Sequence, residues 1–124
     1  MTINAILAKI KDEKPNSFGD DRLIAFINEI EAEVAEQLHV EPAPVYENTT
    51  EGKQVQLLLE HPYDRLYVSY VKAQIDYANE ELESYANNQA QHVQDFRDFV
   101  DWVVRTKQVV DIDHYWPARF RNVM

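Results

Sequence analysis

The chain contains no cysteine and only two glycines among its 124 residues, and these shortages exclude several classes of protein. Without cysteine there can be no disulfide, no thiolate nucleophile and no thiolate metal site. Gly19 and Gly52 are too few for a phosphate-cradling loop or a dinucleotide-binding fingerprint. No serine lies in a nucleophile-elbow sequence. The sequence therefore predicts a protein that is not an enzyme and binds no cofactor.

Long apolar runs are also missing. No run approaches the roughly 18 residues that a membrane span needs. The first ten residues, MTINAILAKI, are amphipathic and lack a cleavage-like end, so we expect no signal peptide. Together with the absence of cysteine, these features predict a cytoplasmic protein without membrane contact.

Basic residues are scarce and unevenly placed. The chain has 12 Lys or Arg against 22 Asp or Glu, a formal charge of −10. Residues 1–104 hold 8 basic and 20 acidic residues, net −12, whereas residues 105–124 hold 4 and 2, net +2. An acidic body repels phosphate, which disfavours nucleic-acid binding as the main activity.

The longest periodic stretch, residues 63–87, predicts a central helix. It contains no glycine and follows Pro62, a residue that a helix start tolerates. Two neighbouring apolar rows predict a face buried over most of the helix circumference: Tyr63, Leu66, Tyr70, Ala73 and Tyr77 in one, and Tyr67, Val71, Ala78, Leu82 and Tyr85 in the other. At about 1.5 Å per residue the helix would be on the order of 36 Å long. Its polar positions recur at spacings of three and four and predict one solvent-facing stripe: Arg65, Ser69, Lys72, Asp76, Glu80 and Glu83.

Three further helices are expected around it. The first has a predicted apolar stripe of Ile3, Ile6, Leu7 and Ile10 and is capped by Thr2. It ends near Lys14, because Pro15 disfavours helical geometry in the residue before it. The second is capped by Asp20 or Asp21. Its predicted buried stripe is Leu23, Ile27, Ile30, Val34 and Leu38, and its predicted solvated face is Glu29, Glu31, Glu33 and Glu36.

The last helix is predicted at about residues 89–106, packed antiparallel on the central helix after a tight connection at residues 87–89; one continuous helix is the alternative. Its predicted inward residues are Val93, Phe96, Phe99, Val100 and Val103, and Asp95, Asp98, Asp101 and Arg105 are expected opposite. The loop at residues 39–60 contains two short segments, residues 45–47 and 54–58, that can pair as a small β-hairpin.

The predicted fold is therefore mainly α: a four-helix, bundle-like single domain over residues 1–106, with the central helix as its scaffold. Residues 107–124 lack helical period and are expected to form an extended C-terminal tail. This tail carries aromatic and arginine side chains of the kind that dominate interfaces, either docked on a neighbour or folded back on its own domain. The candidate partner-binding residues are Tyr115, Trp116, Arg119, Phe120 and Arg121.

No metal site is expected. Glu36 and His39 match the Glu-x-x-His unit of di-iron helical bundles, but those sites need two such units and two further glutamates. The segment 111–114, Asp-Ile-Asp-His, is more simply an acidic surface segment. His61 is expected in a turn, and His92 on a helix surface.

Two blocks of the sequence, residues 17–34 and 61–88, resemble a family of small tailed-phage and prophage proteins that act as head-tail connectors, also called adaptors or head-completion proteins. Together they cover well under half of the chain. The residues that carry the resemblance are Pro62-Tyr63-Asp64, Leu66-Tyr67, Tyr70, Ala73-Gln74-Ile75-Asp76 and Tyr85 in one block, and Phe18, Asp20 and Ile27-Asn28-Glu29 in the other.

The resemblance implies a structural subunit that assembles as a ring of about twelve copies at the neck of the virion, after assembly in the host cytoplasm. Its implied partners are the portal protein, the tail-side neck proteins and DNA that passes through the hole without sequence-specific binding. An acidic body fits that passage because it repels DNA. The alternatives are a small helical adaptor or inhibitor that binds one partner through the C-terminal tail, and a metal-dependent hydrolase or ferritin-like enzyme.

Overall fold

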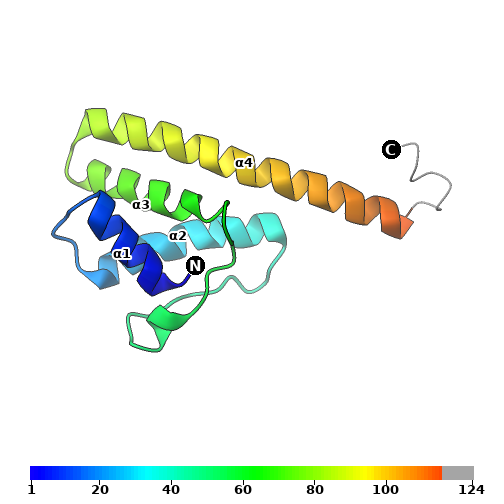
Figure 1. Cartoon of the computed structure of the whole chain (residues 1–124), viewed down its shortest axis with the longest axis horizontal. Coiled ribbons are helices and arrows are strands. Elements are labelled where there is room, and N and C mark those ends of the chain that lie inside the picture. Colours follow the sequence, from blue (N-terminus) through cyan, green and yellow to red (C-terminus); the bar gives the residue numbers. More distant parts are fainter. Residues whose placement is uncertain (116–124) are drawn as a thin grey trace.

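The computed structural model describes the backbone of residues 1–115 and the side chains of residues 1–106. Its elements are α1 (Ile3–Glu13), α2 (Asp20–Leu38), the short 3-10 helix η1 (Gly52–Gln54), α3 (Arg65–Ala78) and α4 (Leu82–Tyr115). Helix α3 packs on α1, α2 and α4, with α4 running antiparallel along one side of it (Figure 1). The mainly helical, bundle-like fold predicted from the sequence is confirmed.

Helices α1 and α2 begin and end close to where the sequence predicts. The hydroxyl of Thr2 accepts a 3.1 Å hydrogen bond from the backbone N–H of Ala5, which caps α1 as expected. Gly19 is the N-cap of α2, so the cap predicted at Asp20 or Asp21 is wrong. Both aspartates lie in the first turn, where a carboxylate interacts favourably with the helix dipole. Both predicted apolar stripes lie in the core, which contains Ile3, Ile6, Leu7, Ile10, Leu23, Ile27, Ile30 and Val34.

The single central helix predicted over residues 63–87 is wrong, because the chain turns back after Ala78. Glu80 has a φ of 60°, and the backbone N–H of Glu81 donates to the carbonyl of Asp76 at 2.9 Å. This left-handed residue closes a short turn, and α4 starts at Leu82. The connection predicted at residues 87–89 therefore lies inside α4, and α3 alone holds the central position.

The break also changes which side of this stretch is buried. Ser69 is 6% exposed and Asp76 is fully buried, although both belong to the predicted solvent-facing stripe. Tyr77 and Leu82, predicted to face inward, are 64% and 71% exposed. Arg65, Ser69 and Asp76 of this stripe contact polar residues of α4. Lys72 instead lies 3.5 Å from Glu13 of α1.

The predicted β-hairpin in residues 39–60 is also wrong. The described residues contain no β-strand, only one bridge between Thr2 and Gln56. Around it, Ile3 N–H donates to the Val55 carbonyl at 3.2 Å and Leu57 N–H donates to the Met1 carbonyl at 3.0 Å. The segment after η1 thus pairs with the start of the chain, and this places Leu57 in the core.

Helix α4 continues to Tyr115, so residues 107–115 are helical where the sequence predicts an extended tail. Its 34 residues correspond to on the order of 51 Å, whereas α3 has 14 residues and covers one part of that length. The end of α4 extends past the rest of the molecule (Figure 1). No helix in the described part of the chain is long and apolar enough to cross a membrane.

Candidate functional site

A buried carboxylate, Glu31 of α2, joins three segments of the chain. Its side chain is fully buried. One oxygen accepts from the Tyr46 hydroxyl at 2.5 Å and the Leu58 N–H at 3.0 Å, and the other accepts from the Tyr67 hydroxyl at 2.6 Å. The Tyr67 hydroxyl in turn accepts from the Leu59 N–H at 3.1 Å. Both oxygens of the buried carboxyl group therefore have hydrogen-bond partners, as a buried polar group requires.

These contacts hold the loop at residues 39–60 on the body of the protein. Asn28 adds two hydrogen bonds to the backbone of Tyr46, one donated at 3.1 Å and one accepted at 2.8 Å. Lys53 reaches Asp20 at 2.8 Å, which ties η1 to the start of α2. Burial, together with the hydrogen bond to Glu31, raises the pKa of Tyr46 well above its ordinary value, so the phenol remains a donor.

Glu31 was predicted to be solvated, and its burial is a correction. It follows Ile27 by four residues and precedes Val34 by three, so it lies on the buried side of the helix. This spacing could have predicted that Glu31 is buried, but glutamate is usually an exposed residue, and the residue type favoured a solvated position.

A second buried carboxylate, Asp76, joins α3 to the start of α4 and the end of α1. One of its oxygens accepts from the Ser84 hydroxyl at 2.7 Å and the Asn88 amide at 2.6 Å, and the other pairs with the ammonium of Lys14. Lys14 also lies 3.0 Å from Glu81. Burial opposes ionisation of Asp76, but the hydrogen bonds from Lys14, Ser84 and Asn88 outweigh it and lower its pKa.

His92 lies between α3 and α4 and is 7% exposed, although it was predicted to be a surface residue. Its Nδ1 lies 3.2 Å from the Leu66 carbonyl and 3.4 Å from the Ser69 hydroxyl. Because the carbonyl only accepts, the hydrogen is assigned to Nδ1. The ring packs against Tyr70 and Phe96, with centroid distances of 5.1 and 5.9 Å. Burial lowers the pKa of His92 below its ordinary value and favours the neutral ring.

We expect His92 to make the protein less stable as the pH falls below about 6.5. The unfolded chain gains a proton at this histidine before the folded protein does, so stability present above that pH is lost on acidification. The variant His92→Gln should lack this part of the pH dependence, at a cost of about 1 to 2 kcal/mol at pH 7 from the lost ring contacts and hydrogen bond.

The measurement is urea unfolding between pH 5 and 8. His61→Gln is the matched control, because the His61 side chain is 91% exposed. If wild type and His92→Gln lose stability in parallel below pH 6.5, the lowered pKa is refuted.

Further polar contacts fix the remainder of the α3–α4 seam. Arg65 lies 3.3 Å from Asp95 and 2.9 Å from Asp98. Asp95 is 4% exposed, whereas the sequence predicts it on the solvent side of α4, and Val93, predicted inward, is 45% exposed. The buried face of α4 is therefore rotated from the predicted one, although Phe99 is fully buried as expected.

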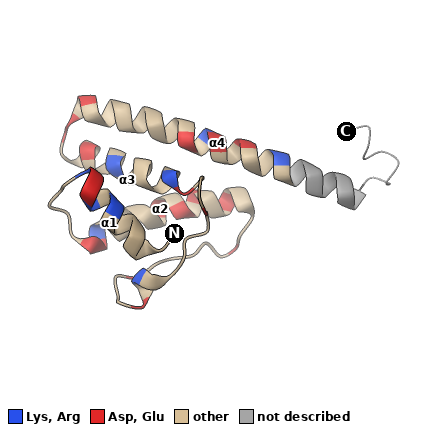
Figure 2. Cartoon of the chain, in the orientation of Figure 1, with Lys and Arg blue, Asp and Glu red and all other residues tan. Residues whose placement is uncertain are grey.

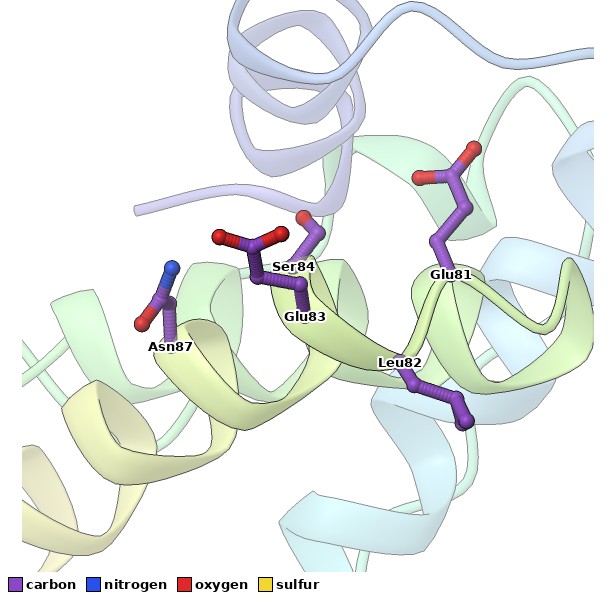
Figure 3. A pocket seen from close by; sticks show the side chains of 5 residues that line it. All are labelled: Glu81, Leu82, Glu83, Ser84 and Asn87. Carbon is purple, nitrogen blue, oxygen red and sulfur yellow. The ribbon is translucent and has the colours of Figure 1, made fainter.

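Two depressions on the surface of the described residues are open and shallow. One is lined by Glu81, Leu82, Glu83, Ser84 and Asn87 at the start of α4, where Leu82 points away from the two glutamates (Figure 3). Another is lined by loop residues and η1: Pro44, Val45, Tyr46, Glu47, Thr49, Glu51, Gly52 and Val55. Within the residues whose side chains are described, no three His, Asp or Glu side chains are grouped as metal ligands.

The sequence-predicted site residues are not brought together by the described structure. Tyr115 is the last residue of α4, while Trp116, Arg119, Phe120 and Arg121 lie outside the described residues. Of the metal candidates, Glu36 is exposed near the end of α2 and His39 is its C-cap. The side chains of residues 111–114 also lie outside the described part.

Comparison with known proteins gives no relative for this chain: no family model matches, and neither the curated proteins nor the solved structures contain a match.

Proposed function

We propose that the chain is a structural subunit of the head-tail connector of a tailed phage or prophage. In this role it forms a closed ring of about twelve copies at the virion neck, between the portal protein and the tail-side neck proteins. In this role the chain binds neighbouring chains and catalyses no reaction. The resemblance of residues 17–34 and 61–88 to connector proteins is the origin of the proposal.

The observation that best supports this proposal is that the C-terminal part of α4 extends beyond the rest of the domain. The start of α3 lies beside Asp98, since Arg65 contacts that carboxylate at 2.9 Å. Phe99, Trp102 and Val103 still pack on the core, so the part of α4 that projects is the 12 residues from Val104 to Tyr115, on the order of 18 Å of helix. A helix that projects from its domain gains little stability from its own hydrogen bonds in water. Packing on a neighbouring subunit or on the portal would stabilise it.

The charge distribution supports passage of DNA through such a ring. Acidic residues lie on all four helices, and basic residues among the coloured part are fewer (Figure 2). A predominantly negative subunit repels the phosphate backbone, so DNA moves past it without binding. Assembly in the host cytoplasm, followed by incorporation at the neck, completes the proposed role.

The experiment is native mass measurement and electron microscopy of the full chain alone and mixed with a portal protein. We expect closed rings, at least in the presence of portal. The alternative function, an adaptor or inhibitor that uses Trp116 and Phe120 to bind one partner, predicts complexes of one or two copies. A chain that forms no closed oligomer with portal and binds one partner in equal amounts would refute the connector role.

A further inference from the structure

The outer face of α4, turned away from α3, carries a second apolar surface. Leu82, Val93 and Val104 are 71%, 45% and 47% exposed and follow one another at intervals of eleven residues, about three helical turns. At 100° per residue, further small or apolar side chains fall on the same line. Together they form the outer stripe of α4: Leu82, Ala86, Ala90, Val93 and Val104, with the exposed Arg97 among them.

This stripe is not needed for the fold. Helix α4 already buries its opposite side through Phe99 and His92, and a surface helix ordinarily has one apolar face. An exposed apolar line bordered by polar residues is typical of an interaction surface, and here Arg97 interrupts it between Val93 and Val104. Its occupant has to match a line about 33 Å long, the rise over the 22 residues between Leu82 and Val104.

The order of residues along the stripe is symmetric about Val93. Leu82 and Val104 lie eleven residues on either side of it. Two α4 helices that run antiparallel and cross at Val93 therefore place Leu82 against Val104 of the second copy. They also place Val93 against itself. The alanines allow the helix axes to approach closely.

Charge at the two ends selects the antiparallel direction. Residues 80–83 contain three glutamates and no basic residue, whereas residues 103–107 contain Arg105 and Lys107 and no acid. Antiparallel pairing brings these ends together, and parallel pairing would bring like charges together. In the same register Arg97 lies opposite Gln89 of the second copy, and Asp101 lies opposite Tyr85. Neither charged side chain therefore faces a side chain of the same charge.

We propose that two copies of this chain pair antiparallel through the outer stripe of α4, with Val93 on the two-fold axis. Such a contact is isologous, because the same patch is used by both copies. A closed ring of many copies uses two different patches, so the dimer is a separate state of the free subunit. The inference does not depend on the connector role.

The absence of cysteine gives a direct test. Val93→Cys creates a chain with a single thiol, which forms a disulfide between copies where the two residues 93 meet. Under mild oxidation we expect most of the chain to migrate as a covalent dimer that reductant reverses. The matched control is Val45→Cys, because Val45 is 76% exposed but lies in the loop. Cross-linking of Val93→Cys no greater than that of the control would overturn the proposal.

Sedimentation equilibrium supplies an independent measurement without a new cysteine. Val93→Glu places two charges at the axis and should raise the dimer dissociation constant at least 100-fold, while Val45→Glu leaves it unchanged. Glu83→Lys and Arg105→Glu should each weaken the dimer by about five- to tenfold, and the double variant should recover most of the loss. Circular dichroism checks that each variant is folded.

Wild-type chain that remains monomeric at every concentration would refute the dimer. A second outcome would also refute it: the wild-type chain does not self-associate, and Val93→Glu no longer forms rings with portal. The outer stripe would then be a contact within the connector ring and not a dimer interface. Ring formation with portal is measured separately by native mass. Absence of the dimer therefore does not refute the connector proposal, and absence of rings does not refute the dimer.

Discussion

Replacing Glu31 by alanine is expected to lower the free energy of unfolding by about 3 to 5 kcal/mol, a large share of the stability of a domain of this size. The change removes the acceptor of the Tyr46 and Tyr67 hydroxyls and of the Leu58 N–H. A buried donor left without a partner costs about 1 to 3 kcal/mol, and the missing side chain leaves a cavity as well. The loop at residues 39–60 should lose its anchor at the same time.

Urea unfolding measures the first effect, and amide hydrogen exchange in residues 39–60 measures the second. Glu31→Gln retains the volume and one acceptor oxygen, so a smaller loss of about 1 to 2 kcal/mol is expected if the alanine variant proves too unstable to study. Glu36→Ala is the matched control, because Glu36 lies on the exposed side of the same helix. An alanine variant within 1 kcal/mol of wild type would show that the network contributes little.

Replacing Asp76 by alanine is expected to cost about 2 to 4 kcal/mol. The substitution leaves the Ser84 hydroxyl and the Asn88 amide without their acceptor, and it separates the end of α1 from the α3–α4 turn. In this variant Lys14 still has Glu81 as an ion-pair partner at 3.0 Å, and Lys14 is partly exposed. The loss of stability is therefore smaller than for a fully buried charge without a partner.

The Asp76–Lys14 ion pair stabilises the folded protein only within a limited pH range. The pKa of Asp76 is lowered in the folded state, so its stabilisation is present above the ordinary aspartate value of about 4 and is lost as the pH falls through the folded value. The hydrogen bond to Asp76 raises the pKa of Lys14, so that contribution is present below about 10.4 and is lost as the pH rises through the folded value.

The difference in stability between wild type and Asp76→Asn should therefore be largest between about pH 5 and 9 and shrink toward both extremes. Chemical unfolding across that range measures it. Asp101→Asn is the control, because Asp101 is exposed on α4. A difference that stays constant from pH 3 to pH 7 would contradict the lowered pKa of Asp76.

Apolar periodicity was sufficient to predict α1 and α2, because each helix has one apolar face and a clear start and end. The stripe from Leu23 to Val34 is buried as predicted, and Thr2 caps α1. The stretch after Pro62 was harder, since the turn at Asn79, Glu80 and Glu81 contains no glycine or proline and the apolar pattern resumes at Leu82. A non-glycine residue in a left-handed conformation gives almost no local signal.

Polarity was a poor guide to exposure in the rest of the chain. Asp76 and His92 are polar and buried because α3 and α4 satisfy each other's hydrogen bonds, and a pattern on one helix cannot show the partner on the next. The hairpin prediction failed for a related reason. The segment around Gln56 pairs with Thr2, 54 residues earlier, and such long-range pairing leaves no local trace.

The central place of α3 also sets the order in which the chain can fold during synthesis. Helices α1 and α2 pack against α3, and the Tyr67 hydroxyl that reaches Glu31 comes 36 residues later in the sequence. At about 5 to 20 residues per second, the ribosome takes roughly 2 to 7 s to add them. Through that interval α1 and α2 can bury their apolar faces only on each other and on the loop, so the parts of those faces that α3 covers stay exposed until α3 emerges.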